Sequence, residues 1–156
     1  MILKIGDNAP DFKGVDENGK DVSLSDFKGK NVILFFYPKD NTPGCTNEAC
    51  NLRDNYDMWI KNGYDIIGVS PDSQQSHQKF ISKHNLPFTL ISDPDKVIIK
   101  LFGAWGPKKL YGREYEGLLR TTFVINEDGI ITYIFEKVKT KDHTNQILET
   151  IEESTV

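Results

Sequence analysis

The chain has 156 residues, the usual size of one domain, and its 38% hydrophobic and 27% charged residues are ordinary for a globular protein. This composition excludes intrinsic disorder and a fibrous fold. Nineteen Lys and Arg against twenty-three Asp and Glu give a net charge of −4 without any basic block, so neither a nucleic acid nor an anionic membrane is an expected partner.

No segment predicts insertion into a membrane or export. The longest apolar stretch, residues 32–37, is far shorter than the roughly twenty residues that cross a bilayer. The first residues lack a basic start, a long apolar run and a small-residue cleavage site. We therefore expect a cytoplasmic protein. No linker or repeat divides the chain, and residues 1–156 are predicted to form a single domain.

The first elements predict a small hairpin followed by a central strand. Residues 11–29 contain a turn signal at Asn18 and Gly19 between short mixed runs, which is typical of a β-hairpin. Residues 32–37 are continuously apolar, as in a strand that is covered on both faces.

Helices and strands then alternate. Apolar residues at helical spacing from Ala49 to Ile60 predict one helix that ends at Asn62 and Gly63. Further expected elements are strands at 65–70 and 88–91, a helix around 77–84, a short helix at 97–102, a hairpin of 121–126 with 130–135, and a C-terminal helix around 147–151. The strand, helix, strand order predicts a parallel crossover. The fold class is therefore α/β, with a mixed central sheet and helices on both faces.

The segment from Pro38 to Cys45 carries the chemistry. Thr42 suits the N-cap of the following helix and Pro43 its first position, so Cys45 falls at the third. Backbone N–H groups lack partners there, and a capping box would place a glutamate at that point. A thiolate, the nucleophilic form of cysteine, is thus favoured at Cys45. The alternative is that Cys45 is a small buried hydrophobic residue.

The second cysteine, Cys50, decides how we interpret the first. Five residues along a helix separate two Cα atoms by about 9 Å, whereas disulfides seldom tolerate more than about 7 Å. A bridge between Cys45 and Cys50 therefore requires the helix to unwind. The spacing is not a Cys-x-x-Cys motif, which argues against a thioredoxin-type disulfide reductase. A two-step cycle fits: Cys45 becomes a sulfenic acid, and Cys50 then condenses with it.

No metal site is expected. The three histidines, His77, His84 and His143, are scattered and lack the short-range ligand spacing of structural zinc sites. His77 and His84 share one helix face, where we expect half-buried or solvated side chains, and the sequence alone places neither of them near Cys45.

The spacing Pro38-x-x-x-Thr42-x-x-Cys45 resembles the active-site signature of the peroxiredoxins. With Cys50, residues 105–109, residues 111–112 and the run Arg120 to Val124, the chain resembles the subfamily called bacterioferritin comigratory protein or peroxiredoxin Q. The resemblance extends from about Gly6 to the final helix.

This resemblance implies a thioredoxin-like fold and a thiol peroxidase that reduces hydrogen peroxide and alkyl hydroperoxides, without a metal or organic cofactor, and that thioredoxin re-reduces. By position, Cys45 would be the peroxidatic cysteine and Cys50 the resolving one. Thr42 would orient the peroxide, Pro38 would shield the site from solvent, and Arg120 matches the family arginine. Because both thiols share one helix, a monomer can complete the cycle.

Alternatives stay open at this point for three of the residues and for the function. Thr42 taken alone is equally a helix cap, Pro38 a strand terminator and Arg120 a surface residue. At the level of function, the competing hypothesis is a binding or chaperone module in which the two cysteines sense oxidation without turnover.

Overall fold

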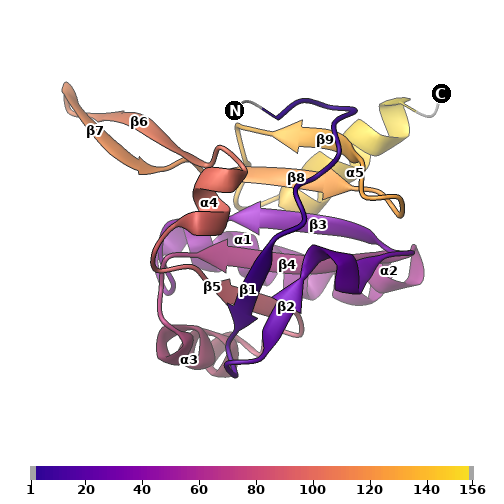
Figure 1. The fold of residues 1–156 in the computed structure, drawn as a ribbon, viewed down its shortest axis with the longest axis horizontal. Coiled ribbons are helices and arrows are strands. Elements are labelled where there is room, and N and C mark those ends of the chain that lie inside the picture. The colour runs from indigo at the N-terminus through magenta and orange to yellow at the C-terminus, as the bar shows by residue number, and fades with distance from the viewer. Residues whose placement is uncertain (1–2, 155–156) are drawn as a thin grey trace.

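The computed structural model describes residues 3–154. Within them a seven-stranded sheet has the order β2-β1-β5-β4-β3-β8-β9, and β6 and β7 form a separate hairpin (Figure 1). The strands are β1 (Lys13–Asp16), β2 (Asp21–Ser23), β3 (Asn31–Phe36), β4 (Tyr64–Ser70), β5 (Thr89–Ser92), β6 (Trp105–Leu110), β7 (Arg113–Leu118), β8 (Thr121–Ile125) and β9 (Ile131–Phe135). The helices are η1 (Leu24–Phe27), α1 (Pro43–Asp54), α2 (Tyr56–Lys61), α3 (Gln74–His84), α4 (Val97–Leu101) and α5 (His143–Ser154).

Strands β3, β4 and β5 are parallel neighbours at the centre of the sheet, and β8 and β9 continue it in antiparallel pairing. Residues 32–36 of β3 are all buried. The predicted central strand, the parallel crossover and the mixed sheet are thus confirmed. Because β3 and β8 run in opposite directions, Phe36 pairs with Thr121, and the end of β3 meets the start of β8.

Two apolar clusters fill the space on either side of the sheet, because successive residues of β3 point to opposite faces. Val32, Leu34 and Phe36 belong to the cluster that also contains Ile98 and Ile99 of α4. Ile33 and Phe35 belong to the cluster beneath α1, α2, α3 and α5, and this second cluster includes Cys45. Figure 1 shows α4 on one side of the sheet and α1, α2 and α5 on the other.

The N-terminal hairpin is confirmed, with Gly19 in its turn at φ 79°. It is not a separate ribbon, however, because β1 also pairs with β5 and so joins the main sheet. No helix of residues 3–154 is long and apolar enough to cross a membrane.

The single helix predicted through Ile60 is wrong, since α1 and α2 are separated at Asn55. The Asn55 side-chain amide donates to the Asn51 carbonyl at 2.8 Å, a local bond that competes with the helical ladder. Helical spacing of apolar residues does not detect a one-residue break of this kind. The predicted end is confirmed, because α2 stops at Lys61 and Gly63 has φ 81°.

The β6–β7 hairpin was not predicted. Tyr111 and Gly112 form its turn with φ values of 50° and 77°, and positive φ at both central residues is typical of a type I′ turn. The two strands contain Pro107 and several charged residues, and most of their side chains are exposed. They therefore lack the alternation of apolar and polar residues that predicts a strand. Figure 1 shows this hairpin projecting away from the sheet.

Candidate active site

A short loop joins the central strand β3 to helix α1, and we call residues 37–42 the active-site loop. Asn41 turns the chain with φ 61°, and Thr42 follows as the N-cap, with Pro43 at the first helical position. The predicted cap position is confirmed, but the Thr42 side chain does not cap. Its hydroxyl instead donates to the Lys39 carbonyl at 2.8 Å. The hydroxyl hydrogen of Thr42 therefore points to Lys39, and the lone pairs of its oxygen point away from Lys39.

Cys45 lies in the first turn of α1 as a free thiol with 1% of its surface exposed. The first helical bond of this turn runs from the Thr46 N–H to the Thr42 carbonyl at 2.8 Å. The N–H groups of Gly44 and Cys45 precede that bond and have no partner within the helix. Two backbone donors thus accompany the sulfur.

Arg120 reaches Cys45 from across the sheet. It immediately precedes β8, and the pairing of β8 with β3 places it beside the active-site loop. Its Nη2 donates to Cys45 Sγ at 3.3 Å, and its Nη1 donates to Glu48 Oε1 at 2.7 Å. A Cβ on Gly44 would lie only 3.3 Å from Nη2, so the absence of a side chain there leaves room for the guanidinium.

Glu48 is a site residue that the sequence analysis missed. It lies one turn after Cys45, is fully buried, and shares the buried helix face with Ala49 and Leu52. An acidic residue at the helical spacing of a buried stripe was the available signal. Burial raises the pKa of Glu48 from its ordinary value to about 7, against the opposing effect of Arg120.

The second oxygen of Glu48 faces His143. Within residues 3–154, Glu48 Oε2 has no hydrogen-bond partner, and it lies 3.6 Å from His143 Nε2. Gln146 Oε1 accepts from the Lys139 N–H, so His143 Nδ1 must donate to that oxygen at 2.9 Å. Burial, aided by the charge of Arg120, lowers the pKa of His143 to about 4. His143 is therefore neutral at neutral pH, and its contact with Glu48 is not an ion pair.

Cys50 lies on the same continuous helix as Cys45 and is half-buried. Five helical residues separate their Cα atoms by about 9 Å, so the folded helix does not bring the two sulfurs together. Pro38 is half-buried in the active-site loop. The structure thus brings Arg120 to Cys45.

The histidines of α3 differ in their surroundings. His77 was expected to be half-buried or solvated, but it is fully buried and paired with Asp40, whose position the sequence could not relate to it. His84 is half-buried, as expected. In the described part of the chain, no group of three or more His, Cys, Asp or Glu side chains could hold a metal ion.

Comparison with known proteins shows the family of this chain. Residues 5–134 match the model of the AhpC/TSA family. The chain is 46% identical over 153 residues to peroxiredoxin Bcp of Bacillus subtilis, covering 98% of each chain.

Two solved structures show the same fold. PrxQ of Xylella fastidiosa has a TM-score of 0.91 at 28% identity, covering 100% of this chain and 99% of that one. The bacterioferritin comigratory protein of Xanthomonas campestris, studied for its alkyl peroxide reduction activity, has a TM-score of 0.85 at 30% identity and covers 93% and 92%. The expected thioredoxin-like fold is thereby confirmed. The chain belongs to the AhpC/TSA family and, within it, to the peroxiredoxins, which are thiol-dependent peroxidases.

Proposed function

We propose that Cys45 is the attacking thiolate in the reduction of hydrogen peroxide and alkyl hydroperoxides. The observation that carries this proposal is the 3.3 Å contact between Arg120 Nη2 and Cys45 Sγ. A guanidinium stays charged at any working pH and stabilises a thiolate beside it. The alkyl peroxide reduction activity of the Xanthomonas campestris relative supports including alkyl hydroperoxides as substrates.

In the first step, the Cys45 sulfur attacks the hydroxyl-bearing oxygen of the hydroperoxide. An S–O bond forms and the O–O bond breaks, and its electron pair leaves with the other oxygen as an alkoxide. That anion takes a proton from solvent and departs as the alcohol, or as water when the substrate is hydrogen peroxide. The sulfur is oxidised to a sulfenic acid and the peroxide is reduced.

Nearby donors stabilise the charge that develops on the departing oxygen. Arg120 lies beside the sulfur, and the N–H groups of Gly44 and Cys45, which have no partner within the helix, are the further donors of this turn. Thr42 orients the peroxide: its hydroxyl hydrogen is directed to Lys39, so its oxygen is free to accept the substrate O–H. Pro38 covers the site and limits access of water.

In the second step, Cys50 resolves the sulfenic acid. Its sulfur attacks the Cys45 sulfur, an S–S bond forms, and the hydroxyl leaves as water with the proton of the Cys50 thiol. Because the helical separation exceeds the reach of a disulfide, α1 must unwind locally before this bond can form. Both thiols belong to one chain, and we propose that a monomer completes the cycle.

A dithiol closes the cycle by reducing the Cys45–Cys50 disulfide through thiol–disulfide exchange, becoming oxidised itself. We propose a thioredoxin as that reductant and the cytoplasm, a reducing compartment, as the location.

Rapid mixing of the reduced protein with hydrogen peroxide tests the proposal. We expect stoichiometric loss of two thiols in the natural protein, no fast thiol loss in Cys45→Ser, and a single turnover that stalls in Cys50→Ser. Removal of peroxide by Cys45→Ser at the natural rate would overturn the assignment of Cys45. Sustained turnover by Cys50→Ser with thioredoxin would show that another group resolves.

A further inference from the structure

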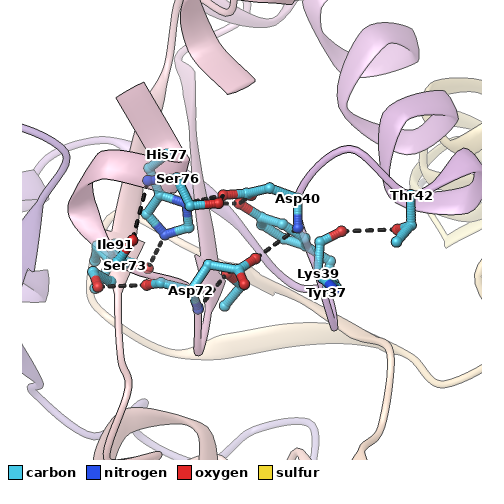
Figure 2. A network of polar contacts seen from close by, with 11 residues as sticks. Tyr37, Lys39, Asp40, Thr42, Asp72, Ser73, Ser76, His77 and Ile91 are labelled. Atoms are coloured by element: carbon cyan, nitrogen blue, oxygen red, sulfur yellow. Dashed lines mark hydrogen bonds and ion pairs between the residues drawn. The ribbon is translucent and has the colours of Figure 1, made fainter. Parts of the chain in front are cut away.

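A second buried ion pair holds the active-site loop at Asp40. The Asp40 carboxylate is 2.7 Å from His77 Nδ1, and the two side chains are 1% and 0% exposed. Asp40 is two residues before Thr42, whereas His77 lies in α3. Figure 2 shows this pair between α3 and the start of α1, with Thr42 and Lys39 beside it.

The hydrogen bonds of His77 fix its protons. Nε2 contacts the Ile91 carbonyl at 3.0 Å, and a carbonyl can only accept, so Nε2 carries a hydrogen. Nδ1 faces the Asp40 carboxylate. Burial lowers the pKa of His77, but the hydrogen bond and the charge of Asp40 together raise it above its ordinary value. Each ring nitrogen of His77 is therefore held by an acceptor, Nε2 by the Ile91 carbonyl and Nδ1 by the Asp40 carboxylate.

Asp40 is held as firmly as its partner. Besides His77, its carboxylate accepts from the Tyr37 hydroxyl at 2.6 Å and from the Ser76 hydroxyl at 2.8 Å. Its backbone N–H donates to Asp72 at 2.6 Å. Asp72, Ser76 and His77 all come from α3 or from the loop that leads into it, as Figure 2 shows. None of these groups belongs to α1.

The network anchors the active-site loop at Asp40, two residues before Thr42. Asn41, in the left-handed region, separates Asp40 from Thr42, and the Thr42 hydroxyl is bonded to the carbonyl of Lys39, the residue before Asp40. The position of Asp40 thus sets the position of the carbonyl that holds Thr42. The Thr42 carbonyl in turn accepts the first helical bond of α1 from the Thr46 N–H at 2.8 Å, so the anchor extends to the first turn of the helix that unwinds.

We propose that Asp40 and His77 are positioning residues for the peroxidase reaction: their ion pair fixes the active-site loop to α3, keeps Thr42 aligned, and favours folded α1 over its unwound form. The proposal rests on the proposed cycle. Loss of the ion pair has two effects of opposite sign on the cycle, because it misaligns the peroxide but facilitates the unwinding of α1. Oxidation of Cys45 becomes slower, and formation of the disulfide becomes faster.

The test compares the natural protein with the double variant Asp40→Ala/His77→Leu, which removes both buried charges together, because removal of one would leave the other unpaired in the core. Rapid mixing measures Cys45 oxidation and subsequent disulfide formation as separate phases. We expect oxidation to slow by about tenfold, as for a modest misplacement of a catalytic group, and disulfide formation to accelerate several-fold. The fraction of Cys45 converted to sulfinic acid at high peroxide should then fall.

Gln78→Ala is the matched control, since it removes a bond from the next residue of α3 to the Glu17 carbonyl, outside the network. It should leave both phases unchanged. If the double variant fails to fold, Ser76→Ala removes one donor to Asp40 and should change both phases in the same directions by about two- to threefold.

The outcomes separate the two proposals. A natural protein that oxidises without forming the Cys45–Cys50 disulfide would overturn the cycle and the positioning role with it. A natural protein that forms the disulfide, together with folded variants whose two phases are unchanged or slow by the same factor, would overturn the positioning role alone.

Discussion

One guanidinium joins two acidic groups: Arg120 donates to Cys45 Sγ at 3.3 Å and to Glu48 Oε1 at 2.7 Å. A thiolate and an ionised Glu48 together would carry two negative charges against the single positive charge of Arg120. Glu48 is fully buried, and its pKa of about 7 means that it holds a proton for part of the physiological range. A neutral Glu48 leaves the charge of Arg120 to the sulfur.

Arg120→Lys should slow oxidation of Cys45 by about a hundredfold, the usual effect of losing one donor to a developing oxyanion. Lysine keeps the charge but lacks the planar fork that reaches the sulfur and Glu48 at once. Stopped-flow thiol loss measures the rate. Arg53→Lys, in a half-exposed pair with Asp54 on α1, serves as the control and should change little. Equal rates for both variants would contradict a role for Arg120.

Gly44→Ala should separate activity from stability. The new Cβ would stand 3.3 Å from Arg120 Nη2, and the bonds of Arg120 to Cys45 and Glu48 limit how far it can move away. We expect oxidation to slow several-fold, while the free energy of unfolding changes by no more than about 1 kcal/mol because alanine favours a helix. Asn47→Ala, in the same helix, is the control. Unchanged kinetics in Gly44→Ala would show that Arg120 has more freedom than the structure indicates.

Glu48→Gln should alter how stability depends on pH. Folding raises the pKa of Glu48 to about 7, so the folded chain holds a proton that the unfolded chain releases between about pH 4.5 and 7. The stabilisation is present below pH 4.5 and is lost as the pH rises to 7, by about 1 to 3 kcal/mol. Urea unfolding of the reduced protein across this range measures it. The difference between the natural protein and Glu48→Gln should follow this slope, and a constant difference would contradict the account.

His143→Gln should alter the dependence of stability on pH in the opposite direction. Burial lowers the pKa of His143 to about 4, so the unfolded chain binds a proton below pH 6.5 that the folded chain refuses. Neutral His143 therefore contributes to the free energy of unfolding above pH 6.5, and this contribution is lost as the pH falls toward 4. His84→Gln, at a half-buried position on α3, is the comparison variant. A loss of stability in His143→Gln that does not vary with pH would show that His143 titrates as in the unfolded chain.

The sequence predicted what depends on local chemistry. The strand at 32–37, the cap at Thr42 and the position of Cys45 follow from residues that are adjacent along the chain, and apolar period and capping preferences report such features directly. The mixed sheet followed from the order of its elements.

The sequence could not predict contacts that depend on tertiary packing. Without the family resemblance, nothing in the run around Arg120 shows that the pairing of β8 with β3 brings it to Cys45. The same holds for His77, which looks solvated by its spacing and is buried because Asp40 lies opposite it. Glu48 was detectable only as an acidic residue on a buried helix face.

Peptide mass analysis after addition of one equivalent of peroxide tests the Cys45–Cys50 cycle most directly. Trypsin cleaves after Lys39 and Arg53 and leaves both cysteines in one peptide, whereas cleavage after Glu48 separates them. We predict that the tryptic peptide loses two hydrogens, about 2 Da, and that after cleavage at Glu48 its halves separate only upon reduction. Halves that separate without a reductant, with Cys45 carrying only added oxygen, would contradict resolution by Cys50.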